Sequence, residues 1–110
     1  MMIETTAGMP IDSAVLHNYF RTLVNHFFKI LPIREQNEES LTTYMQSLQA
    51  ELLGAKGLVS AIQNDASYLT LLSILQYLID HPGCSVREVK REVFHAISIC
   101  NKLKAQYEDM

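Results

Sequence analysis

Apolar residues recur every three or four positions along most of this chain, a spacing that predicts amphipathic helices. The first helix begins after Asp12 or Ser13, either of which can cap it, and runs to Pro32. Its apolar positions are Leu16, Phe20, Leu23, Phe27 and Leu31. Residues 1–11 have no such period and contain a glycine and a proline, so we expect a flexible, disordered tail. No segment shows the alternation that is typical of a strand.

The second predicted helix, over residues 38–63, has the most regular pattern. Its apolar positions alternate in steps of four and three, as in a coiled-coil seam: Leu41, Met45, Leu48, Leu52, Ala55, Val59 and Ile62. The opposite face holds only small residues at the same steps: Thr43, Ser47, Ala50, Gly54, Gly57 and Ala61. A glycine inside a helix costs about 1 kcal/mol relative to alanine. Two of them on one face suggest that a second helix approaches closely; an exposed face of small residues, or a kink near Gly54, is the alternative.

The third predicted helix follows Asp65, which can cap it. Residues 66–79 include no charged residue, and a thin polar stripe is formed by Thr70, Ser73 and Gln76. The helix ends before Pro82 and Gly83, which stop it. Because so little of its surface is polar, we expect another surface to cover it.

The fourth predicted helix occupies residues 86–107, and an S-x-x-E capping box of Ser85 and Glu88 marks its start. Its apolar positions are Val86, Val89, Val93, Ala96, Cys100, Leu103 and Tyr107. Whether one helix or two cover this range stays open at this point. Four helices with short links predict an all-α protein, an antiparallel four-helix bundle, with residues 12–110 as a single domain.

The composition bears on which partners and which cellular location we expect. The net charge of −3 does not favour general attraction to nucleic acid or to anionic membranes. Residues 68–79 are too short to cross a bilayer, which needs about 20 apolar residues. The amino end lacks the basic start and apolar run of a signal peptide. Cys84 and Cys100 form no CxxC pair, so we expect a cytoplasmic protein with reduced thiols and no membrane partner.

The small stripe and the apolar third helix together predict a non-enzymatic protein–protein interaction or self-association module. We expect a homodimer, or a protein partner that covers the second and third helices; the sequence does not separate the two. The predicted interface residues are Ser47, Ala50, Gly54, Gly57, Ala61, Tyr68, Leu71, Leu72 and Leu75.

A DNA-binding function is the alternative. Residues 72–107 contain a Pro-Gly turn, a serine cap followed by a glutamate, and a final Leu-Lys. This pattern resembles the helix-turn-helix core of winged-helix transcription regulators. The resemblance implies that the recognition helix reads bases and its neighbour contacts phosphates. The residues concerned are Arg87, Lys90, Arg91, Ser98, Asn101, Lys102 and Lys104. The family's turn glycine is missing near residues 93–95, and no strand pair follows to form a wing.

Enzyme motifs are sparse. Arg21 and His26 have the R-x4-H spacing, which resembles HEPN-type ribonucleases and implies RNA cleavage with His26 transferring protons. This is the third alternative. His26 and Lys29 also resemble the H-x-x-K of histidine phosphotransfer bundles. Glu92 and His95 form one E-x-x-H without a second copy. We therefore predict no catalytic residues, no metal and no cofactor.

Overall fold

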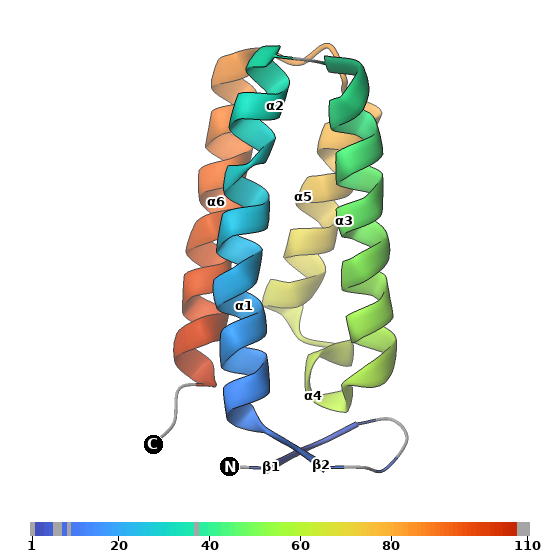
Figure 1. The fold of residues 1–110 in the computed structure, drawn as a ribbon, viewed down its shortest axis with the longest axis vertical. Helices are drawn as coiled ribbons and strands as arrows, with labels where there is room; N and C mark the ends of the chain where they lie inside the picture. The colour runs from blue at the N-terminus through green and yellow to red at the C-terminus, as the bar shows by residue number, and fades with distance from the viewer. Residues whose placement is uncertain (1, 6–7, 9, 37, 108–110) are drawn as a thin grey trace.

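A computed structural model of the chain describes residues 2–5, 8, 10–36 and 38–107. The helices in this part are α1 (Ser13–Phe28), α2 (Ile30–Gln36), α3 (Glu38–Leu58), α4 (Ser60–Gln63), α5 (Ala66–Asp80) and α6 (Val86–Gln106). The strands are β1 (Met2–Glu4) and β2 (Pro10–Asp12), as Figure 1 shows. The protein is mostly helical, which agrees with the predicted all-α class.

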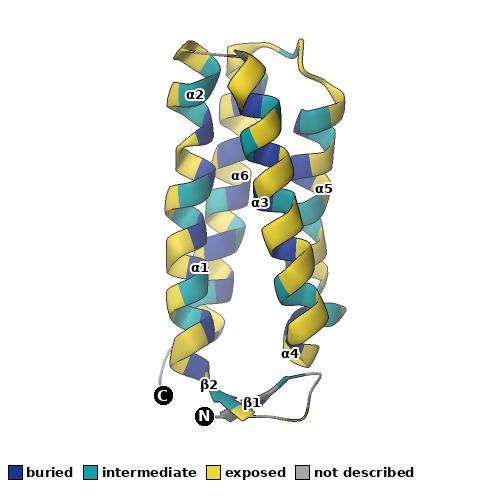
Figure 2. Ribbon diagram, turned by 45° about the vertical axis from the view of Figure 1, so that its right-hand side comes forward, coloured by how far each residue is buried: buried dark blue, intermediate teal, exposed yellow. Residues whose placement is uncertain are grey.

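The long helices lie side by side along the long axis of the molecule, and α2 continues the direction of α1 (Figure 1). α1 packs against α6, α3 packs against α5, and α5 also contacts α6. Figures 1 and 2 both place α1 and α6 together on one side and α3 and α5 on the other. We refer to these as the α1/α6 side and the α3/α5 side.

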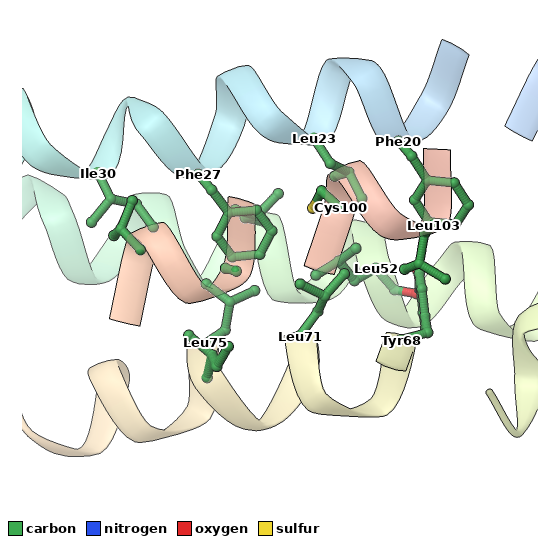
Figure 3. Close-up of a cluster of buried hydrophobic side chains, with 14 of the residues drawn as sticks. Phe20, Leu23, Phe27, Ile30, Leu52, Tyr68, Leu71, Leu75, Cys100 and Leu103 are labelled. Atoms are coloured by element: carbon green, nitrogen blue, oxygen red, sulfur yellow. The ribbon is translucent and has the colours of Figure 1, made fainter. Parts of the chain in front are cut away.

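Most of the predicted apolar positions meet in one hydrophobic core between the two sides (Figure 3), whereas Val86, in the first turn of α6, is 39% exposed. Phe20 stacks on Tyr107, with 5.7 Å between the ring centroids, and meets Tyr68 edge to face at 6.2 Å. Buried in the same core are Leu23, Phe27, Leu52, Leu71, Leu75, Val93, Cys100 and Leu103. The helical period thus identified the inner faces of all the long helices.

The first predicted helix is divided at Lys29, and this changes which residue is buried beyond it. Ile30 is fully buried, whereas Leu31, the predicted position, is only partly buried. Pro32 does not end the helix. It lies in the first turn of α2, where a missing backbone N–H removes no bond that a helix would otherwise make.

The second predicted helix is also divided. α3 ends at Leu58, and Val59 has extended backbone angles, φ −119° and ψ 110°, before the short α4 begins. Val59 forms a β-bridge with Thr5, while Val59 and Ile62 remain buried as the seam predicted. The glycine at position 57 and the β-branched Val59 both weaken a helix at this point, so the chain can leave it at small cost.

The amino end differs from the sequence prediction. β1 and β2 pair antiparallel, with Ile3 opposite Ile11, and Ile3 is buried. Gly8, between the strands, has a φ of 81°, a conformation that glycine adopts more readily than other residues. The sequence analysis predicted a flexible tail here and recognised no strand, because strands of three residues are too short to show a period.

The helix caps follow the prediction. The carboxylate Oδ1 of Asp12 accepts from the N–H of Ala14 at 3.0 Å, and that of Asp65 accepts from Tyr68 at 3.0 Å. The Ser85 hydroxyl oxygen accepts from the N–H of Glu88 at 3.1 Å. Each cap satisfies a backbone donor that a helix start leaves without an intrahelical partner.

Candidate interaction surface

The small residues of α3 and α4 lie on the outside of the molecule. Ser47, Ala50, Gly54, Gly57 and Ala61 are all exposed, and we name these five residues the small stripe. A Cβ atom added at Gly54 or Gly57 would meet no heavy atom within 4 Å. The two glycines are therefore not required by the packing of this chain on itself.

Two large apolar side chains flank the small stripe. Leu53 is 53% exposed and Leu58 is 62% exposed. Leu53 lies three residues after Ala50, and Leu58 lies four residues after Gly54, so both are neighbours of the stripe on the helix surface. Figure 2 shows that the outward side of α3 is exposed along the helix. The outer surface of α3 thus carries small side chains, and exposed leucines lie on both sides of them.

Three predicted interface residues are buried inside the molecule. Tyr68, Leu71 and Leu75 have no exposed surface, and Figure 3 shows all three pointing from α5 into the core. Leu72 is half-buried. These three residues are removed from the predicted interface, because α5 lies between α3 and α6 and both of its apolar flanks find partners within the chain.

The predicted polar stripe of α5 faces the solvent. Ser73 and Gln76 are exposed, and the Gln76 side chain joins Gln49 of α3 at 2.8 Å. Leu69 is 38% exposed on the same helix. A thin stripe of polar side chains is therefore enough here, and α5 does not need a partner molecule on its own account.

The core contains polar groups that stay neutral. The Tyr68 hydroxyl donates to the backbone oxygen of Leu52 at 2.6 Å, and burial raises the pKa of Tyr68 to about 12. Burial also raises the pKa of the Cys100 thiol to about 12 and raises that of Tyr19. The pKa of the Cys84 thiol is raised by burial first and by Glu88 next. Raised thiol pKa values leave little thiolate at neutral pH, so the cysteines are poor nucleophiles.

The residues of the DNA-binding alternative lie on one uninterrupted helix. α6 is helical throughout Val86–Gln106, so residues 93–95 form no turn between two short helices. The helix-turn-helix arrangement that the resemblance implies is therefore not formed. The residues proposed to contact DNA all lie on α6, where Lys104 is half-buried. The others are exposed: Arg87, Lys90, Arg91, Ser98, Asn101 and Lys102.

The residues of the ribonuclease alternative lie on α1. Arg21 is exposed and His26 is half-buried, and the Tyr44 hydroxyl donates to the backbone oxygen of His26 at 2.8 Å. His26 lines a shallow pocket together with Tyr44, Ser47, Leu48 and Glu51 of α3. The pocket therefore brings His26 together with a carboxylate and two hydroxyl groups.

Other candidate chemistry in the described residues is limited. Glu92 pairs with Arg91 at 3.5 Å, and His95 is exposed. Within residues 2–5, 8, 10–36 and 38–107, no cluster of three His, Cys, Asp or Glu side chains is placed to hold a metal. In the same part of the chain, no helix combines the length and apolarity needed to span a bilayer.

Two features were missed by the sequence analysis. Phe28 and Phe94 are 50% and 51% exposed and touch each other edge to face, with 6.1 Å between the ring centroids. Each directly follows a buried seam residue, and this offset predicts the outward position. At the end of the molecule near the α5–α6 turn, Arg34 Nη2 donates to the Cys84 carbonyl at 3.2 Å beside a small cavity.

No protein-family model, curated protein or solved structure matches this chain.

Proposed function

We propose that this protein is a non-enzymatic interaction module that self-associates through the outer surface of α3. The observation that carries the proposal is the exposed small stripe between Leu53 and Leu58. Small side chains let a partner approach the helix backbone closely, and the two leucines supply apolar area to bury. As part of the same proposal, the helices form an antiparallel four-helix bundle that acts in the cytoplasm with both thiols reduced.

The glycines support this proposal because the fold does not need them. Each one costs about 1 kcal/mol of helix stability relative to alanine, and an alanine side chain would fit at both positions. This loss of helix stability is explained if the glycines allow another molecule to pack closely against the helix.

The test replaces both glycines by leucine. The Cβ atoms added by Gly54→Leu and Gly57→Leu meet no other atom of the chain within 4 Å, and the rest of each leucine adds bulk where a partner must approach. We expect the association constant, measured by sedimentation equilibrium, to fall by at least about tenfold, which corresponds to about 1.4 kcal/mol. Circular dichroism should show that helicity is retained.

The matched control is Gly54→Ala with Gly57→Ala. It makes the same improvement in helix propensity without the bulk, so it should associate as the wild type does and unfold at higher denaturant concentration. An unchanged solution mass for the leucine variant, with helicity retained, would contradict the proposal. So would a wild-type protein that is monomeric at every concentration.

A further inference from the structure

The two sides of the molecule carry opposite charge. Residues 13–29 and 85–107, which include α1 and α6, hold seven Lys or Arg and two acidic residues. Residues 39–80, which include α4 and α5 and nearly all of α3, hold four acidic residues and one Lys. Because α1 with α6 and α3 with α5 lie on opposite sides in Figures 1 and 2, this is a separation in space.

The positive charge of the α1/α6 side is exposed. Its exposed basic residues are Arg21, Lys29, Arg87, Lys90, Arg91 and Lys102. Glu88 and Glu92, the acids of α6, are half-buried, and both lie within 4 Å of Arg91. The surface therefore presents an excess of cations to any molecule that approaches it.

An apolar anchor lies within this basic surface. Phe28 of α1 and Phe94 of α6 form the half-exposed edge-to-face pair. Lys90 and Arg91 precede Phe94 by four and three residues, so they lie beside it on α6. Protein–protein contacts typically bury aromatic side chains at their centre and carry polar and charged residues at their rim.

The α3/α5 side offers the complement. Glu39, Glu51 and Asp80 are exposed there, and so are Leu53 and Leu58. Contact between two copies through the same side would place like charges against each other, which opposes association. Contact between unlike sides would pair cations with carboxylates and the phenylalanine pair with the leucines.

We infer that the α1/α6 side of one copy docks on the α3/α5 side of a second copy, with Phe28 and Phe94 as the apolar anchor. This inference rests on the proposed function and names the partner surface. The contact is heterologous, so each added copy leaves one basic and one acidic side available for the next. The assembly is then a chain or a ring, and not the homodimer that the sequence analysis expected.

A mixing experiment tests the inference. One variant, Phe28→Gln with Phe94→Glu, disables the basic side; the other, Leu53→Lys with Leu58→Lys, disables the acidic side. All four positions are exposed on helices, and circular dichroism checks that both variants fold. We expect each variant alone to be monomeric by sedimentation velocity. Their equimolar mixture should form a dimer that grows no further, since each variant keeps one intact side.

The behaviour of the wild-type protein distinguishes failure of this inference from failure of the proposed function. It should form a series of sizes that increase with protein concentration, and its association should weaken as salt is raised, because exposed charges are screened. If the wild type forms a closed dimer that the phenylalanine variant leaves unchanged, the inference is wrong and the proposed function stands. If the wild type is monomeric at every concentration, both fail.

A nucleic-acid occupant of the basic side is the third outcome. Binding of a single-stranded oligonucleotide that depends on Phe94, by a wild-type protein that remains monomeric, would overturn the inference. Stacking on exposed aromatic side chains and attraction to basic residues would then explain the surface.

Discussion

Along α6 the helix continues without interruption from Val86 to Gln106, whereas on the opposite side α3 stops at Leu58 and gives way to the extended Val59. The inner faces of the two sides are equally buried, with residues such as Val93 and Leu52 showing no exposed surface. The outer faces differ in charge, in side-chain size and in the kind of apolar residue they expose.

This difference separates two kinds of information in the sequence. The inner faces repeat at the helical period and determine how the helices pack. The outer faces are not required by that packing, and under the proposed function their glycines, leucines and phenylalanines form the contact with another copy.

The largest effect should come from the inner face of α1. Phe20→Ala removes a fully buried ring that contacts Tyr68 and Tyr107, so we expect a loss of about 3–5 kcal/mol in the free energy of unfolding. The matched outer-face variant, Phe94→Ala, should cost under about 1 kcal/mol in the same urea titration, made on dilute protein. Similar losses for the two variants would show that the outer phenylalanine belongs to the core.

Alkaline pH should lower the free energy of unfolding through two buried residues of the core between the two sides. Cys100 and Tyr68 have ordinary pKa values of 9.0 and 10.0, and burial raises both to about 12 in the folded protein. Between those values the unfolded chain loses protons that the folded chain keeps, so unfolding becomes more favourable as pH rises. The stabilisation is complete below pH 9 and is lost as pH increases to about 12.

Urea unfolding at a series of pH values measures this loss. Each group contributes a fall of about 1.4 kcal/mol per pH unit within its own window. Cys100→Ala should reduce the fall between about pH 9 and pH 10, where the thiols of the unfolded chain lose their protons. If the variant keeps the full pH slope of the wild type, the thiol does not cause it.

Smaller effects should come from the helix caps, one on each side. Asp12→Ala removes the acceptor for Ala14 in α1, and Asp65→Ala removes the acceptor for Tyr68 in α5. Each should lower the free energy of unfolding by about 1 kcal/mol in urea titrations. Ser98→Ala, at an exposed position within α6, is the control and should change stability very little. Losses no larger than that of the control would show that the caps are not needed.

The fold was largely predictable because the helices are long and strongly periodic. Asp12, Asp65 and Ser85 were recognisable as caps, since each precedes an apolar period directly. The interruption at Val59 was not predictable, because Val59 and Ile62 keep the seam spacing on both sides of it. It depends on the pairing with Thr5, a contact between distant parts of the chain.

The candidate surface was predictable only in part. The small stripe is visible in the sequence because its spacing matches the seam on the opposite face. Tyr68, Leu71 and Leu75, which were predicted for the interface, are buried within the chain itself, and hydropathy does not distinguish burial by the same chain from burial by a partner. The charge separation between the two sides was missed for a related reason: it appears only when α1 and α6, the first and last long helices, lie together.

The bridge between Thr5 and Val59 also bears on the order in which the molecule folds. The two residues are separated by about half of the chain, and the entropic cost of closing a loop increases with its length. Neighbouring helices such as α5 and α6 need only a short loop to meet, and contacts that are local in sequence form quickly. We therefore expect the bridge to form late in folding, and α3 to extend as one longer helix through residue 63 until the amino-terminal strand pairs with it.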